Sequence, residues 1–213
     1  MVFQFRELIT LVSSTIIENI EDRRKLGLAS LGFFYCDFRD DDKKNFRGLV
    51  SSLLVQLCDH SDPYTTILSD FYIAHGRGSR HPSDEALLEC LTRIFRLPGQ
   101  APVHIIIDAV DECPNASGTP TPREKILKLV EKLVSLRLQN LRICITSRPE
   151  ADIKRVFEGL HFRHVSLHSE GGQMQDIDDY VRSFVNTDWK MKSWTADDKE
   201  LVIEVLTKRA DGM

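Results

Sequence analysis

The chain has 213 residues, enough for one sizeable domain or slightly more. Its 42% hydrophobic and 28% charged residues are typical of a soluble globular protein, and its formal net charge of -4 gives no bulk attraction for nucleic acid or an anionic membrane. No apolar run approaches the roughly 20 residues that span a bilayer, and residues 1–7 lack the basic start and apolar core of a signal peptide. We therefore expect a cytoplasmic protein without nucleic-acid or membrane partners.

The cysteines predict reduced thiols. Five are present, an odd number, and none forms a C-x-x-C pair: Cys36, Cys58, Cys90, Cys113 and Cys144. Such scattered cysteines are typical of buried thiols in a cytosolic protein, not of a disulfide framework. Cys113 follows a group of acids, but no histidine is placed in sequence to activate it, so a packed thiol is expected there too.

Helical spacing and turn residues divide the first hundred residues into a helix, a strand and further helices. The first helix is expected over residues 7–25, with Gly27 placed to end it, and the strand over residues 28–35. The further helices are expected over residues 45–58, 62–73 and 83–96.

The second half is built around two apolar strands, residues 103–107 and 141–146. Between them, Thr121-Pro122-Arg123-Glu124 is a strong helix start, with Thr as the cap, Pro at the first position and Glu closing a capping box. The remaining elements are expected over residues 150–157, 173–185 and 195–209 as helices, and near 162–167 as a strand. Alternating strands and helices predict an α/β fold with a parallel sheet covered on both faces.

Three acids follow the first of these strands within five positions: Asp108, Asp111 and Glu112. A short apolar run such as Val103 to Ile107 is typical of a strand buried on both faces, and open α/β sheets bind ligands at the carboxyl ends of such strands. Because a buried acid costs free energy unless it is paired or binds a metal, Asp108 is placed where a hydrated Mg²⁺ would be held. The alternative is a solvated strand end followed by a turn.

Several segments together resemble the NACHT-type NTPases. The stretch from Ile105 to Glu112 resembles their Walker B strand, and Ile143 to Glu150 resembles their sensor-1 strand, which ends in Thr-Ser-Arg. Further similar segments are Gly32 to Phe38, Ser13 to Glu18 and Leu206 to Met213. The most similar group is the nephrocystin-3-like N-terminal domain found in fungal STAND signalling proteins.

This resemblance implies a three-layer α-β-α parallel sheet of the P-loop NTPase type over residues 1–170, and a helical segment over residues 171–213 that follows Gly171-Gly172 as a joint. It also implies a switch driven by ATP or GTP with Mg²⁺. Asp108 would hold the metal shell, and Asp111 and Glu112 would polarise the attacking water. Arg148 and Thr146, at the end of the sensor-1 strand, would contact the nucleotide.

The phosphate-binding loop of that family is missing. Alignment on Ser13 to Glu18 places Leu8-Ile9-Thr10 where the family has Gly-Lys-Ser, so only Thr10 could keep a role, as a metal-binding hydroxyl. The strand before the loop is also missing or degenerate, with residues 1–5 as the one remaining candidate. Losing a central strand leaves backbone edges that need covering.

We therefore expect a degenerate NACHT-like module with weak or absent nucleotide hydrolysis, acting with other protein domains, other proteins or further copies of itself. A nucleotide-free interaction scaffold and a truncated gene product are the alternatives. The histidines His161, His164 and His168 are expected at the surface and not at a zinc site, because only two of them share a strand face and no cysteine joins them.

Overall fold

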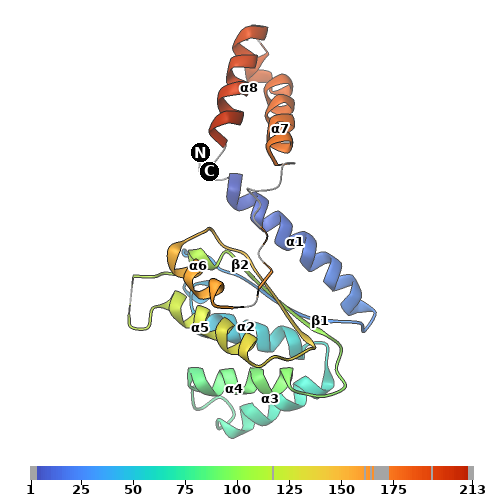
Figure 1. Ribbon diagram of the computed structural model, residues 1–213. Coiled ribbons are helices and arrows are strands. Elements are labelled where there is room, and N and C mark those ends of the chain that lie inside the picture. Colours follow the sequence, from blue (N-terminus) through green and yellow to red (C-terminus); the bar gives the residue numbers. More distant parts are fainter. Residues whose placement is uncertain are drawn as a thin grey trace. The chain divides into compact units, whose positions relative to one another are not determined.

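The computed structural model describes residues 4–116, 118–160, 162–163, 165, 173–192 and 194–210, with side chains from residue 12 onward except at 173–177, 190 and 208–210. The chain forms two compact units, Met1–His161 and Phe162–Met213 (Figure 1). None of the helices within the described ranges is long and apolar enough to cross a membrane.

The first unit contains a three-stranded parallel sheet. Its strands are β1 (Ser30–Tyr35), β2 (Val103–Asp108) and β3 (Leu141–Ile145), in the order β1-β2-β3. The expected α/β class is confirmed. β2 is buried along its whole length because both of its edges are paired, whereas the edge strand β3 is only half-buried and therefore less covered than its apolar sequence predicts.

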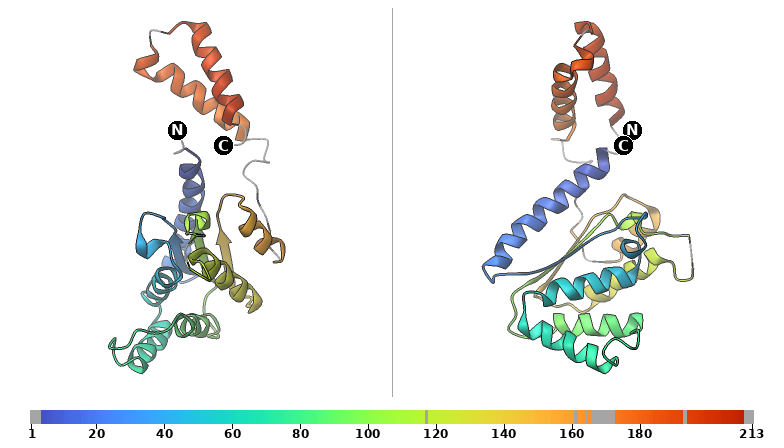
Figure 2. Two further views of the ribbon diagram at one scale, coloured as in Figure 1. Left: turned by 90° about the vertical axis from the view of Figure 1, so that its left-hand side faces the viewer. Right: turned by 180° about the vertical axis from the view of Figure 1, so that it is seen from behind.

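Helices cover both faces of this sheet (Figure 2). On one face, α1 (Gln4–Lys25) packs Ile16, Ile17 and Ile20 against Leu31 and Ile106. On the other face, α2 (Phe46–Cys58) lies against β1 and is itself covered by the next helices. Those helices are α3 (Asp62–Ala74), α4 (Asp84–Phe95) and α5 (Pro122–Ser135), followed along the chain by α6 (Ala151–Glu158).

The close packing of β1 on α2 depends on a missing side chain. A Cβ atom at Gly32 would lie 3.0 Å from Leu53 Cδ2 and 3.2 Å from Ile105 Cδ1. The strand therefore approaches the helix through a glycine, which lets the leucines of α2 fill the space above the sheet.

The second unit is a pair of packed helices, α7 (Gln173–Thr187) and α8 (Ala196–Ala210), joined through the short 3-10 helix η3 (Trp189–Met191). Arg182 of α7 links the two, with Nε 2.6 Å from Asp178 Oδ2 and Nη2 2.9 Å from Glu200 Oε1. The Thr195 hydroxyl caps α8 by accepting from the Asp198 amide. A helical C-terminal segment is as expected from the sequence.

Two strand predictions differ from the structure. Gln4 and Phe5 belong to α1, so the suggestion that residues 1–5 form a strand is wrong for these two, and residues 1–3 lie outside the described residues. Phe162, Arg163 and Val165 belong to no strand, and the other residues of the expected strand, with all three histidines discussed above, also lie outside the described part. No described strand pairs with the outer edge of β3.

His104, in β2, should make the first unit less stable in mild acid. Burial lowers the pKa of its imidazole, and the charges of Arg142 and Arg23 lower it further. The imidazole therefore binds a proton more readily in the unfolded chain than in the folded one. As a result, the free energy of unfolding falls as the pH drops below about 6.5. Chemical denaturation measures the free energy of unfolding at about pH 7.5 and at about pH 5. The decrease between the two pH values should be smaller for His104→Gln than for the unmodified chain. Equal losses in the two proteins would show that His104 is not the group that titrates.

Candidate functional site

The carboxylate of Asp108 joins three elements at the end of β2. Its side chain is only 2% exposed. Oδ1 accepts a hydrogen bond from the Ser13 hydroxyl of α1 and another, at 2.7 Å, from the Thr146 hydroxyl directly after β3. A buried carboxylate is costly unless hydrogen-bonded, and these two hydroxyls reduce that cost from both sides. Sequence reasoning selected Asp108 and Thr146 but missed Ser13, which lies one helical turn after Thr10.

Thr146 also fixes the backbone turn that follows Asp108. Its Oγ1 accepts a hydrogen bond from the Ala109 amide at 2.9 Å. Ala109 has φ 56° and ψ 51°, a left-handed conformation that costs an L-residue about 1–2 kcal/mol. One hydroxyl therefore holds both the acid and the strained residue that turns the chain into the 3-10 helix η2 (Val110–Glu112).

A pair of variants tests the strain at Ala109. Ala109→Gly should leave the free energy of unfolding equal to or above that of the unmodified chain, because glycine adopts positive φ without steric cost. Ala109→Val should lower it by about 1–2 kcal/mol, since a β-branched residue resists this conformation. Urea unfolding of the unmodified chain and of the two variants gives the order of their free energies of unfolding. A valine variant as stable as the glycine variant would contradict the assigned backbone conformation.

Asp111 and Arg148 form a second contact at the same strand ends. The Asp111 side chain is 8% exposed; its Oδ1 accepts from the Arg148 amide at 3.0 Å, and its Oδ2 lies 3.5 Å from Arg148 Nε. The Arg148 side chain is 53% exposed. The structure thus brings two of the expected site residues together as an ion pair. Glu112 follows in η2 and is half-buried.

Arg123, the second residue of α5, is a site residue that sequence reasoning missed. Its Nε donates to the Cys113 carbonyl at 2.9 Å and its Nη2 to the Asp111 carbonyl, while Nη1 pairs with Glu150 and, at 3.3 Å, with Asp152. Burial opposes its charge, but the hydrogen-bonded carboxylates outweigh burial and raise the pKa of the guanidinium. The sequence placed Arg123 inside a strong helix start, and nothing in that pattern distinguishes a surface arginine from a buried one.

The segment aligned with the phosphate loop is helical. Leu8, Ile9 and Thr10 all belong to α1, which begins at Gln4. From the fifth residue of a helix onward, backbone N–H groups are bonded to carbonyls one turn earlier, so these three amides cannot form a phosphate cradle as well. The side chain of Thr10 lies outside the described ones.

A family model described as Nephrocystin 3, N-terminal matches residues 10–148, well over half of the chain. The chain belongs to this family. The match includes Ser13, Asp108, Thr146 and Arg148, and residues 1–9 lie outside it. No curated protein and no solved structure matches the chain.

Two acids of this nephrocystin 3 N-terminal chain, Asp108 and Asp111, are already bonded to neighbouring groups of the protein. Hydroxyl and carboxylate oxygens are the ligands that Mg²⁺ accepts. Here, however, the Asp108 oxygen is engaged by Ser13 and Thr146, and Asp111 is engaged by Arg148. Within the described residues, no three His, Cys, Asp or Glu side chains are grouped so that they could hold a metal ion. In this arrangement Asp108 Oδ1 and the Asp111 carboxylate are bonded to other groups of the protein.

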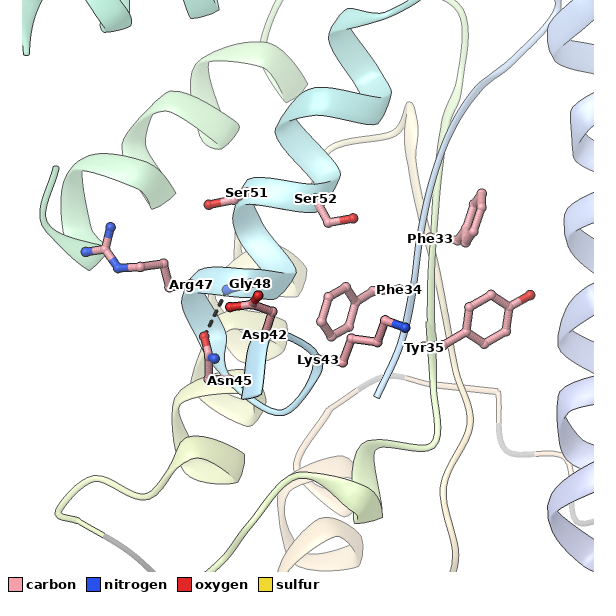
Figure 3. Close-up of a pocket in the computed structure, with 10 residues that line it drawn as sticks. All are labelled: Phe33, Phe34, Tyr35, Asp42, Lys43, Asn45, Arg47, Gly48, Ser51 and Ser52. Atoms are coloured by element: carbon pink, nitrogen blue, oxygen red, sulfur yellow. Dashed lines mark hydrogen bonds between the residues drawn. The ribbon is translucent and has the colours of Figure 1, made fainter. Parts of the chain in front are cut away.

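A separate cavity of about 540 Å³ lies where β1 ends and α2 begins (Figure 3). Phe34, Lys43, Arg47 and Ser52 are among its lining residues, and the Asn45 side chain caps α2 by accepting from the Gly48 amide at 2.9 Å. Asp108 and Arg148 are not among them. Tyr35, which pairs with Asp108 across the sheet, does line it. The sequence indicated only a charged loop followed by a helix there.

All five cysteines are free, as expected, and Cys144 alone among them is not fully buried. Cys36 and Cys113 are neighbours beneath the acidic turn. The adjoining Cys113 thiol and burial raise the pKa of Cys36 far above its ordinary value. Cys36 is therefore a protonated thiol, and Cys113 is free and buried, which agrees with the expectation of a packed residue there.

Proposed function

We propose that this chain is a degenerate NACHT-like nucleotide-binding module of a STAND signal-transduction protein, descended from an ATP- or GTP-driven switch and retaining weak or no nucleotide hydrolysis. Membership of the nephrocystin 3 N-terminal family supports the origin. The three-stranded parallel sheet with an acid at the end of its central strand is consistent with a P-loop ancestry.

One observation carries the proposal of weak activity: the Asp108 carboxylate is buried and bonded to hydroxyls from α1 and from the end of β3. A ligand that binds Asp108 at this strand end would have to break these hydrogen bonds and take the place of the two hydroxyl donors. Arg148, the expected phosphate contact, is paired with Asp111, and the amides of residues 8–10 are used within α1. The groups that phosphoryl transfer requires are therefore occupied by one another.

In this proposal the acidic strand end has become a structural junction between α1, β2 and β3. A rigid α/β core of this kind can present its helices and its second unit to other domains of a signalling chain, to other proteins or to further copies of the chain. Asp108 then stabilises the fold of the module, and catalysis by Asp111 and Glu112 is lost or slow.

The alternative function is a nucleotide-free interaction scaffold. The observation that favours it is the outer edge of β3, which no described strand pairs and whose strand carries the sequence Leu-Arg-Ile-Cys-Ile. An unpaired strand edge can accept an additional strand from a partner.

Phosphate release from ATP and from GTP tests the proposed function. We expect the purified chain to release phosphate at the rate of a Glu112→Gln variant and of buffer alone. A clear rate that the Glu112→Gln substitution abolishes would overturn the proposal of lost hydrolysis. Retention of labelled ATP on the chain then separates the two functions, because only the nucleotide-binding module should retain it, and weakly.

A further inference from the structure

Arg123 lies between the acidic loop and the start of α6 and contacts both. It lies at the start of α5, its side chain is 7% exposed, and its guanidinium is shared between the acidic loop of residues 111–113 and the first residues of α6. The planar guanidinium has donors pointing in several fixed directions, so one group can hold a loop and a helix end at the same time.

On the loop side, Arg123 binds the backbone. Its Nε and Nη2 donate to the carbonyls of Cys113 and Asp111, on either side of Glu112. The same short segment is closed by hydrogen bonds from the Glu112 amide to the Ala109 carbonyl, 2.9 Å, and from the Cys113 amide to the Val110 carbonyl, 3.1 Å. Arg123 therefore fixes the backbone that carries Asp111 and Glu112.

On the α6 side, Arg123 binds two acids at the beginning of the helix. Nη1 pairs with Glu150, the N-terminal capping residue of α6, and lies 3.3 Å from Asp152 Oδ2 in the first turn. These acids are favoured at a helix N-terminus, and the buried guanidinium supplies their counter-charge. α6 is the last helix before the second unit begins at Phe162.

We propose that Arg123 is a positioning residue that couples the acidic loop to the start of α6, so that a change at either one alters the stability of the other. The proposal goes beyond the proposed function and does not depend on nucleotide binding. It assigns this coupling to the side chain of Arg123. Weakening the contact of Arg123 with Glu150 should therefore reduce the protection of the Glu112 and Cys113 amides from hydrogen exchange.

Amide hydrogen exchange, resolved by residue in NMR spectra, tests this coupling. Arg123→Met should speed exchange of the Glu112 and Cys113 amides roughly tenfold or more, since loss of hydrogen bonds to a charged group costs at least that factor. Lys128→Met, which removes an exposed cation from the same helix, should leave these rates unchanged. Glu150→Gln should speed the same two amides severalfold, and Glu158→Gln, near the other end of α6, should not.

The double variant decides between coupling and simple packing. In the Arg123→Met background, Glu150→Gln should produce no further change at Glu112 and Cys113, because the link is already cut. The proposal would be overturned if the effects of the two substitutions on the exchange rates of Glu112 and Cys113 were fully additive. It would also be overturned if Arg123→Met alone left these rates unchanged. If Arg123→Met does not fold, Arg123→Lys takes its place in the cycle: it keeps the charge and loses the fork, and the same non-additivity is required of it.

Discussion

Replacing Thr146 by valine should lower the free energy of unfolding by about 3 kcal/mol, a large effect for a residue at the edge of the sheet. Valine has nearly the same shape but no hydroxyl. The buried Asp108 carboxylate then loses a donor at 2.7 Å, and the Ala109 amide loses its acceptor at 2.9 Å. Each buried polar group left without a partner costs about 1–3 kcal/mol, and here two are affected by one substitution.

Thr146→Ser is the matched control, since it keeps the hydroxyl and removes only a methyl group. We expect it to cost about 1 kcal/mol or less. Urea unfolding monitored by circular dichroism gives both values. If the valine and serine variants were equally stable, the hydroxyl would not be the link that joins Asp108 to Ala109.

Replacing Gly48 by alanine should also lower the free energy of unfolding strongly. Helix propensity alone would predict the opposite sign. Gly48 lies in the first turn of α2, where alanine would ordinarily stabilise the helix by about 1 kcal/mol. A Cβ atom at this position, however, would lie 1.7 Å from the backbone carbonyl oxygen of Asp42. Backbone cannot move aside as a flexible side chain can, so we expect a loss of about 2 kcal/mol or more.

The thermal unfolding midpoint of Gly48→Ala, compared with that of Ser51→Ala one turn later, measures this effect. Ser51→Ala should be nearly neutral, because the same helix gains an alanine without a backbone clash. A Gly48→Ala variant with a raised midpoint would show that the loop containing Asp42 does not pack on α2 as described.

The sequence predicts the elements of the first unit well because each has a strong local signal. The apolar run from Val103 to Ile107 becomes the buried central strand. The cap at Thr121 forms as expected, with Thr121 and Glu124 exchanging hydrogen bonds at the start of α5. Such signals arise from neighbouring residues, so one sequence is enough to detect them.

The contacts that make the site are not local, and this is why they were missed. Ser13 meets Asp108 across 95 residues, and Arg123 reaches Glu150 across 27. Ser13 and Arg123 are ordinary helix residues by pattern, and only the packing of α1 and α5 makes them partners of the acidic loop. Leu8 to Thr10 are different, because their local spacing already predicts helix over residues 7–25 and the structure confirms it, although the alignment sets them against a loop motif.

The partner of Arg148 also depends on a contact that is not local in the sequence. Its place after β3 follows from the sequence, but its ion pair with Asp111 depends on two turns that lie side by side at the strand ends. Charge alone could not decide between a phosphate and a carboxylate as its partner.

Calorimetric titration of the chain with ATP, in Mg²⁺ and again in a chelator, tests the central claim most directly. The account predicts no Mg²⁺-dependent binding tighter than about 1 μM, because the helical amides of residues 8–10, the Asp108 carboxylate and Arg148 are all engaged within the chain. Submicromolar ATP binding that requires Mg²⁺ and disappears in Asp108→Asn would contradict it.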